Sequence, residues 1–362
     1  MNKLKVLIVW FQALNGIMEY YPDARTSNLQ KSKYLKLYSL AHSLFMVCGL
    51  PSIYLDFMLT NPVLFYKIPS NWFDFGTLFS IVLYTIGVFL AIHVMRFQKS
   101  SIQRIYDELK NLDLINPVPN DLRFLNIIQF IKLINISTHL GVLFYFCYLY
   151  IGTTDLMSWF YIIYYVWMDN LISAMSVVMH EILWKICYCS IGMRLELNQL
   201  LSARVKLQKL LQLFKRQQDL IKVCSKFSDT FRHLLLWYSL RTLLICVLSG
   251  YIVIRIQITR KELFFSGEYA IFSLTEFYLL NYMAEFVADL IPDTIQVLRL
   301  TDPQDLRIKR AITWMDVQLS CQSTEIRIYG AITLNRRFCF VLMTEIVLNT
   351  IYMVQSDYFF LE

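Results

Sequence analysis

The chain has 362 residues, of which 57% are hydrophobic, 15% aromatic and only 17% charged, and its mean hydropathy is +0.47. This composition excludes an ordinary soluble domain and predicts a polytopic membrane protein. The formal net charge of +7 reflects basic loops that orient membrane helices, so we expect no nucleic-acid partner.

Seven long apolar runs predict seven transmembrane helices, because about 20 residues at roughly 1.5 Å each cross a hydrocarbon core of about 30 Å. Their expected ranges are 37–59, 73–95, 129–152, 158–182, 233–256, 269–292 and 338–356. A membrane barrel would instead show short alternating segments. We therefore predict an all-α protein embedded in the lipid bilayer.

The distribution of Lys and Arg predicts the orientation of these helices. Of the 34 Lys and Arg residues, 28 lie in the alternate segments 1–36, 96–126, 183–232 and 296–337. Such segments stay in the cytoplasm. The N-terminus is then cytoplasmic, and seven crossings place the C-terminus outside the cell. The opening stretch 1–16 resembles a signal peptide but lacks a cleavage pair, so we expect a cytoplasmic helix on the membrane surface.

These observations divide the chain into four parts. Residues 1–36 form a cytoplasmic N-terminal segment, and 37–295 hold the first six helices with cytoplasmic helical extensions at 183–232. Residues 296–337 are expected to form a cytoplasmic anchor helix, over about 303–325, capped by Thr301 and followed by a break at Gly330. Residues 338–362 form the last membrane helix and a short extracellular end.

An apolar stripe marks the long inner segment between the fourth and fifth spans. Leu200, Leu207, Phe214 and Ile221 recur every seven residues, which places them along one face of a helix. Both flanking membrane helices are therefore predicted to continue into the cytoplasm. The stripe needs a partner, which is either another part of this chain or a second copy in an assembly.

Motifs for catalysis or metal binding are absent from the sequence. There is no phosphate loop and no nucleophile elbow, and the five histidines give no pair at the helical spacing of a zinc site. We therefore expect no enzyme, no metal and no cofactor. None of the eight cysteines falls in an outer loop, and Cys187 and Cys189 are either palmitoylated or packed.

Charged residues in the spans must be paired, hydrated or functional. Three carboxylates follow one another at intervals of four in the sixth span: Glu285, Asp289 and Asp293. Arg241 is a natural partner for them, and Lys132 could meet Glu181, either as structural ion pairs or along an ion path. Asp169 lies near the middle of the fourth span and either bonds to neighbouring helices or faces a water-filled pocket.

Aromatic residues crowd the outer halves of several spans. An interfacial belt explains part of this pattern, and an outward-facing pocket for a small organic ligand explains it as well. The candidate ligand-binding residues are Phe146, Tyr164, Tyr165, Asp169, Tyr278 and Tyr282.

Two stretches carry a family resemblance. Gly192 to Leu201, "GMRLELNQLL", is similar to the Arg-Leu-x-x-Leu-Asn pattern of insect gustatory receptors, the relatives of insect odorant receptors. That family ends its last span with Thr-Tyr, five apolar residues and Gln-Phe. Here Thr350 matches, Ile351 replaces Tyr, Asp357 replaces Gln and Tyr358 stands for Phe. With its topology, the chain resembles a divergent member of this family.

The resemblance implies a taste receptor that is a ligand-gated, non-selective cation channel in the plasma membrane of sensory neurons. It also implies a homo- or heterotetramer with other gustatory receptors, which binds a sugar or bitter compound and conducts cations through a pore lined by the last helix. Thr350, Val354 and Asp357 share one face of that helix, which makes them the expected pore residues.

Two other classes are open alternatives, namely a receptor subunit that signals only with partner receptors and a membrane transporter. A G-protein-coupled receptor would place its basic loops on the opposite alternation. A transporter would favour internal repeats and helices broken by Gly or Pro, which ten glycines and eight prolines, few of them in mid-span, do not supply.

Overall fold

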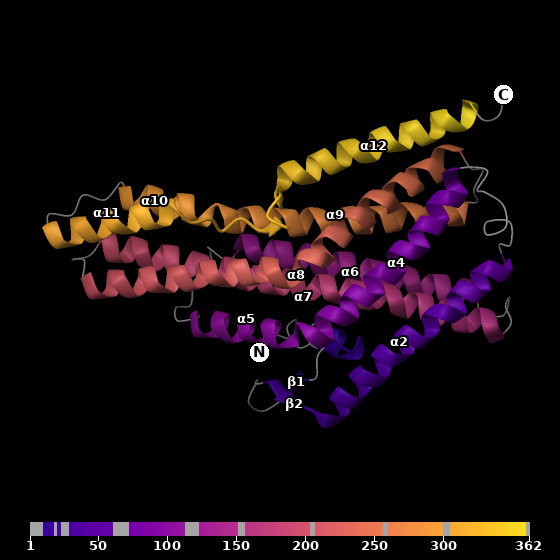
Figure 1. The fold of residues 1–362 in the computed structure, drawn as a ribbon, viewed down its shortest axis with the longest axis horizontal. Coiled ribbons are helices and arrows are strands. Elements are labelled where there is room, and N and C mark those ends of the chain that lie inside the picture. The colour runs from indigo at the N-terminus through magenta and orange to yellow at the C-terminus, as the bar shows by residue number, and fades with distance from the viewer. Residues whose placement is uncertain are drawn as a thin grey trace.

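The computed structural model describes residues 10–17, 20–22, 29–60, 72–112, 123–150, 156–202, 207–255, 260–299 and 305–359, and most of these are helical. Seven long helices each overlap one predicted span (Figure 1). They are α2 (Lys33–Thr60), α4 (Trp72–Phe97), α6 (Arg123–Tyr150), α7 (Leu156–Ser202), α8 (Leu207–Arg255), α9 (Arg260–Ala288) and α12 (Arg336–Phe359). The predicted all-α fold class is confirmed.

Within the described ranges, five of these helices contain a stretch that is long and apolar enough to cross a membrane: α4, α6, α7, α8 and α12. The other two coincide with the first and sixth predicted spans. α9 carries Glu268, Glu276 and Glu285, and these carboxylates make it more polar than its neighbours. These carboxylates therefore need hydrogen-bonding partners on neighbouring helices for α9 to lie within the bundle.

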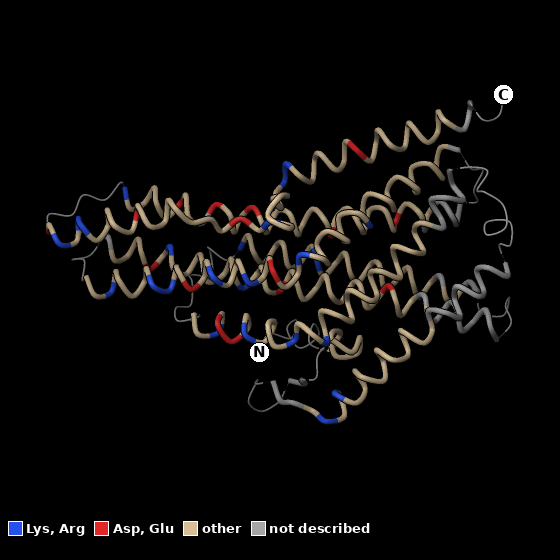
Figure 2. Tube along the Cα trace, in the orientation of Figure 1, with Lys and Arg blue, Asp and Glu red and all other residues tan. Residues whose placement is uncertain are grey.

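The helices α7 and α8, with 47 and 49 residues, run far beyond the length needed to cross a bilayer. Their extensions lie beside α5 (Lys99–Leu112), α10 (Leu290–Arg299) and α11 (Leu306–Ser320). Lys and Arg gather on this half of the molecule (Figure 2). α8 is the central helix, since it packs against α4, α5, α7, α9 and α12.

The extensions enclose a second apolar core, separate from the core of the membrane bundle. It comprises Leu197, Leu210, Leu213, Phe214, Ile291, Leu298, Ile308, Ile312, Met315 and Leu319. Phe214 is buried there, while Leu200, Leu207 and Ile221 are half-buried against it. The apolar stripe thus packs within this chain. It is divided between two helices, because Leu200 lies on α7 and the other three lie on α8.

The anchor helix differs in its ends from the prediction. α11 begins at Leu306, and the Asp305 side chain accepts a hydrogen bond from the Arg307 backbone at 2.8 Å, as an N-cap does. The expected range 303–325 was therefore wrong at both ends, and Thr301 lies outside the described residues. An Asp one residue before the helix supplies the oxygen that the first turn needs.

A short hairpin separates α11 from α12. The strands β3 (Arg327–Ile328) and β4 (Ile332–Thr333) pair antiparallel, and Tyr329 and Gly330 between them have φ of 52° and 71°. Positive φ at consecutive positions is typical of tight hairpin turns and favours Gly. The predicted break at Gly330 is confirmed, and it sets the point at which α12 starts its crossing.

The N-terminal segment lies against the first membrane helix. Strands β1 (Tyr20–Pro22) and β2 (Leu29–Lys31) pair antiparallel, and the Ser39 hydroxyl donates to the Gly16 carbonyl at 2.5 Å.

Nearer the centre of the fold, Cys187 and Cys189 of α7 are both buried. Packing, rather than palmitoylation, therefore explains these two cysteines.

Candidate functional site

A buried polar group in the membrane bundle is centred on Asp169, which has no solvent exposure. Its Oδ1 accepts hydrogen bonds from Arg241 Nη2 at 3.1 Å and from the Tyr269 hydroxyl at 2.6 Å. Arg241 Nη2 also lies 2.6 Å from the Tyr269 oxygen and 3.3 Å from the Tyr84 oxygen. The helices α4, α7, α8 and α9 are therefore joined through one carboxylate and one guanidinium.

His139 of α6 adds the fifth helix to this buried group. Its Nε2 lies 2.5 Å from Asp169 Oδ2, and its Nδ1 lies 3.3 Å from Glu268 Oε1. A neutral imidazole has one N–H and the imidazolium has two, so the protonated ring satisfies both carboxylates. The ring also stacks on Phe272 at 3.9 Å. Two positive and two negative groups then balance each other, as buried charges require.

A second buried pair lies between the same helices. Lys132 of α6 bonds to Glu276 of α9, and Ser176 of α7 bridges them at 2.8 Å from the Lys132 Nζ and 2.5 Å from Glu276 Oε2. Asn135 Nδ2 donates to the other Glu276 oxygen at 2.9 Å. This lysine and carboxylate thus form a satisfied structural pair.

Arg241 stands out among the buried charged residues because two of its guanidinium nitrogen atoms lack a hydrogen-bond partner among the described residues. It is 1% exposed, yet its Nε and Nη1 have no partner among the described residues. The guanidinium lies 5.3 to 5.8 Å from the ring centres of Tyr84, Trp237, Tyr238 and Tyr269, where cation–π attraction stabilises it. An acceptor oxygen atom near Nε and Nη1 would supply the hydrogen-bond partner that these two nitrogen atoms lack.

The predicted ion pairs were wrong in their partners. Arg241 lies with Asp169 instead of the carboxylates of the sixth span, and Lys132 lies with Glu276 instead of Glu181. Glu285 binds Arg336 at 2.8 Å, and Asp293 binds Arg194 at 2.6 Å. The physical reason is that α8 runs outward, so Arg241 lies in its outer half, far from the inner end of α9.

The predicted ligand residues are only partly brought together. Tyr164 is fully buried, its hydroxyl donates to the Met46 carbonyl, and its ring fills the space in which a side chain at Gly49 would sit. It therefore packs α7 against α2. The side chains of Tyr165 and Phe146 lie outside the described part of the structure.

Tyr278 and Tyr282 lie apart from Asp169. Their rings are 6.0 Å from each other, and Tyr282 contacts Phe124 and the Arg336 guanidinium, which is 5.3 Å from its ring centre. Arg336 begins α12 at the inner surface, so these tyrosines face the cytoplasmic half. Tyr269, one residue after Glu268, takes the place beside Asp169 that was expected for them.

Several members of the buried group around Asp169, and the partner of Lys132, were not predicted from the sequence. His139, Glu268, Glu276 and Tyr84 were not singled out, although two of them are carboxylates in or next to an apolar run. That was the available signal, because a carboxylate in a membrane helix needs a cation. Lys132 in the third span should have pointed to Glu276.

The face of α12 that was expected to line a pore packs against the rest of the subunit. Thr350 is 7% exposed, and a Cβ on Gly250 of α8 would lie 2.9 Å from its methyl group. Val354 is half-buried on the same side, and the Asp357 side chain lies outside the described residues.

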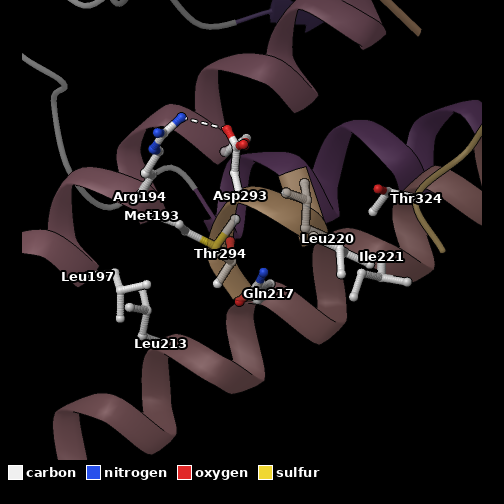
Figure 3. Close-up of a pocket in the computed structure, with 12 residues that line it drawn as sticks. Met193, Arg194, Leu197, Leu213, Gln217, Leu220, Ile221, Asp293, Thr294 and Thr324 are labelled. Carbon is white, nitrogen blue, oxygen red and sulfur yellow. Dashed lines mark hydrogen bonds and ion pairs between the residues drawn. The ribbon is translucent and has the colours of Figure 1, made fainter. Parts of the chain in front are cut away.

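A hollow also lies among the cytoplasmic extensions, with about 470 Å³ of empty space, open solvent included. In Figure 3 the Arg194 guanidinium reaches Asp293 at its rim, and Met193 and Gln217 lie below. Met193, Arg194 and Leu197 belong to the stretch that carries the family resemblance. That stretch therefore joins α7 to α8 and α10.

The whole architecture is matched by known proteins. The sequence fits the family described as "7tm Chemosensory receptor" over residues 5–360. The chain belongs to this chemosensory receptor family. The resemblance to insect gustatory and odorant receptors is thereby confirmed, as is the prediction that the protein is not an enzyme.

Individual relatives of this chemosensory receptor agree with that assignment. A Drosophila melanogaster protein named "Putative gustatory receptor 85a" is 27% identical over 376 residues, which cover 96% of this chain and 91% of that protein. The olfactory receptor OR5 from Machilis hrabei, solved in complex with eugenol, has a TM-score of 0.75 and 12% identity and covers 98% of this chain and 99% of its own. The structure of OR5 determined separately has a TM-score of 0.72, with 12% identity and 98% of each chain covered.

Proposed function

We propose that this chemosensory receptor is a subunit of a ligand-gated, non-selective cation channel that responds to a taste compound. The observation that carries the proposal is the buried group of Arg241, Asp169 and His139, where five membrane helices meet. A buried guanidinium with two unused donor atoms is suited to bind a polar small molecule.

The ligand is proposed to offer an oxygen acceptor to Arg241 Nε and Nη1 and an apolar or ring surface to the surrounding aromatic side chains. Sugars and bitter compounds can both meet this description. Because Arg241 Nη2 also holds Asp169 and Tyr269, a ligand that draws the guanidinium toward itself would weaken the links from α8 to α7 and α9. Binding would then change the free energy of one helix arrangement relative to another.

α8 can carry this change to the pore. Gly250 lies nine residues after Arg241 on the same helix, about 14 Å along its axis, and it contacts Thr350 of α12. A rotation or shift of α8 would therefore move the helix that we propose lines the pore. Four such subunits, alike or combined with other gustatory receptors, would enclose the pore in the plasma membrane of sensory neurons.

The test is expression of this chain alone, with a screen of sugars and bitter compounds read out as membrane current. For any active compound, Arg241→Lys keeps the charge but removes the planar fork, so the concentration for half-activation should rise about tenfold or more while the maximal current stays near wild type. Lys222→Arg, on an exposed cytoplasmic surface, is the matched control and should leave the response unchanged.

Two results would reject parts of the proposal. An equal loss of maximal current and surface protein in Arg241→Lys would mean that Arg241 only supports folding. Uptake of the compound without single-channel currents would favour a transporter, and current that appears only with a second receptor would favour the subunit that needs partners. The uninterrupted courses of α7 and α8 support the channel, because transporters commonly break their helices at the binding site.

A further inference from the structure

His139 of α6 is the member of the buried group that can gain and lose a proton, because a guanidinium keeps its proton and an imidazole does not. The residue is 1% exposed and lies between two carboxylates, with Asp169 at its Nε2 and Glu268 at its Nδ1. A neutral ring has one N–H, so it can donate to only one of them. Loss of the proton would therefore place a nitrogen lone pair against a carboxylate oxygen inside the bundle.

Ionisable groups from four other helices surround His139 and its two carboxylates. Within the described residues they are Tyr84 of α4, Asp169 of α7, Tyr238 and Arg241 of α8, and Glu268 and Tyr269 of α9. Among these groups one guanidinium faces two carboxylates. The charges therefore balance when the group holds one further proton, and His139 is the base that touches both carboxylates.

The second buried pair leaves this balance unchanged. Lys132 and Glu276 bond to each other, so their charges cancel wherever the proton between them lies. His180 is eleven residues after Asp169, on the same side of α7, and its Nε2 has no partner among the described residues. A proton on His180 would give the interior a net positive charge, which a membrane bundle disfavours. The balancing proton therefore belongs to His139.

Glu268 connects this proton to the surface of the subunit. Its side chain is 13% exposed, whereas those of His139 and Asp169 are 1% and 0% exposed. It lies eight residues after the start of α9 at Arg260, about 12 Å along the axis, in the outer half of the bundle. A carboxylate that contacts both the surface and a buried imidazole can pass a proton between them.

We propose that His139 is a binding site for one external proton, and that this proton is a second ligand of the receptor beside the taste compound. The proton passes from water to the Glu268 carboxylate and then to the Nδ1 of His139, and no other bond forms or breaks. Its binding stabilises the bundle, because the imidazolium completes the charge balance between the helices that meet at Asp169.

The coupling of the proton to the taste compound rests on the proposed function of Arg241. A ligand that draws the guanidinium toward itself leaves Asp169 with His139 as its remaining cation. Loss of the proton then costs more in the ligand-bound state than in the free state, so each ligand favours the binding of the other. The concentration for half-activation should therefore rise at alkaline pH, by up to about tenfold for each pH unit over which the proton is lost.

The proton site is tested without any taste compound. The thermal unfolding midpoint of purified protein in detergent is measured from mildly acidic to alkaline pH. The stabilisation by the imidazolium is present at the acidic end, so the wild-type midpoint should fall as the pH rises and the proton leaves. His139→Gln should start from a lower midpoint and lack this fall, whereas His93→Gln, at an exposed histidine of α4, should keep the wild-type profile.

A second variant tests the charge balance and does not depend on the folding of His139→Gln. Glu268→Gln removes one negative charge, so Arg241 and Asp169 balance each other without the proton. Its midpoint should begin to fall at a pH lower by about one unit or more than in the wild type. The double variant Glu268→Gln with His139→Gln should be less destabilised than the sum of the two single variants.

Two results would overturn the proton site. They are an unfolding profile in Glu268→Gln that falls over the same pH range as the wild type, and strict additivity in the double variant. Either result would mean that His139 contributes packing alone, through its stacking on Phe272.

The coupling is measured as the half-activating concentration of a non-ionisable active compound over the same pH range. It should rise with pH in the wild type and in His93→Gln and stay constant in His139→Gln. Currents whose half-activating concentration ignores pH would reject the proton as a second ligand and leave the channel. Correctly assembled protein that shows the proton-dependent midpoint but no compound-evoked current would reject the proposed function and leave the proton site.

Discussion

Replacing Asp169 by Ala removes the acceptor for three donors at once, on His139, Arg241 and Tyr269. Removal of one partner of a buried ion pair typically costs about 3–5 kcal/mol, because the other charge is left uncompensated. The cost should lie toward the upper end here, since Arg241 is 1% exposed and has no other carboxylate among its described partners.

The assay is thermal unfolding of purified protein in detergent, followed by fluorescence-detected size exclusion. Asp169→Ala should lower the unfolding midpoint by about 5 °C or more. The control Asp219→Ala removes an exposed carboxylate that pairs with Lys222 at 3.1 Å, and such pairs contribute at most about 1 kcal/mol. Its midpoint should therefore stay close to that of the wild type.

A double variant separates the ion pair from simple loss of packing. Asp169→Leu combined with Arg241→Met leaves no unpaired charge, so it should be less destabilised than the sum of the two single variants. Equal midpoints for Asp169→Ala and Asp219→Ala, or strict additivity in the double variant, would refute the reasoning that these charges are coupled.

Two further predictions concern packing. Gly87→Ala should reduce the yield of folded protein, because its Cβ would lie 2.1 Å from the Trp237 ring. In the control Gly141→Ala nothing lies within 4 Å of the added Cβ, so the variant should be neutral or more stable by up to about 1 kcal/mol. Similar yields for the two variants would contradict the close approach of Gly87 to Trp237. Phe214→Asp should release α10 and α11 from α8, because the Phe214 ring is buried and lies 5.1 Å from Trp314. Phe214→Asp should therefore speed amide hydrogen exchange in α10 and α11, whereas the control Leu211→Asp, at a position that is 42% exposed, should not. Unchanged exchange in Phe214→Asp together with a smaller oligomer would place Phe214 between subunits instead.

Much of the architecture could be predicted from the sequence, because the bilayer imposes local rules. A membrane helix needs an apolar run of a certain length, and basic loops remain in the cytoplasm. These rules are readable residue by residue, so the seven spans, their orientation and the long extensions of α7 and α8 followed directly. The break at Gly330 was equally local, since positive φ is a property of one residue and its turn.

The partners of the buried charges could not be predicted in this way. The sequence shows that Lys132, Arg241 and Asp169 need partners, but the choice depends on the rotation of each helix and on its neighbours. Helices such as α7 are apolar on most sides, so their composition does not indicate which face meets α6 or α9. Glu276 became the partner of Lys132 because three helices bring them together at Ser176.

The last helix shows the same division between sequence and structure. The sequence by itself determined that α12 crosses the membrane and carries polar residues on more than one side, with Thr350 on one and Glu345 on the other. Only the tertiary structure decided which side is packed, because the missing side chain at Gly250 on α8 leaves room for Thr350 to approach closely. Close packing selects one helix face by shape, and the shape of a partner 100 residues away is not a property of α12.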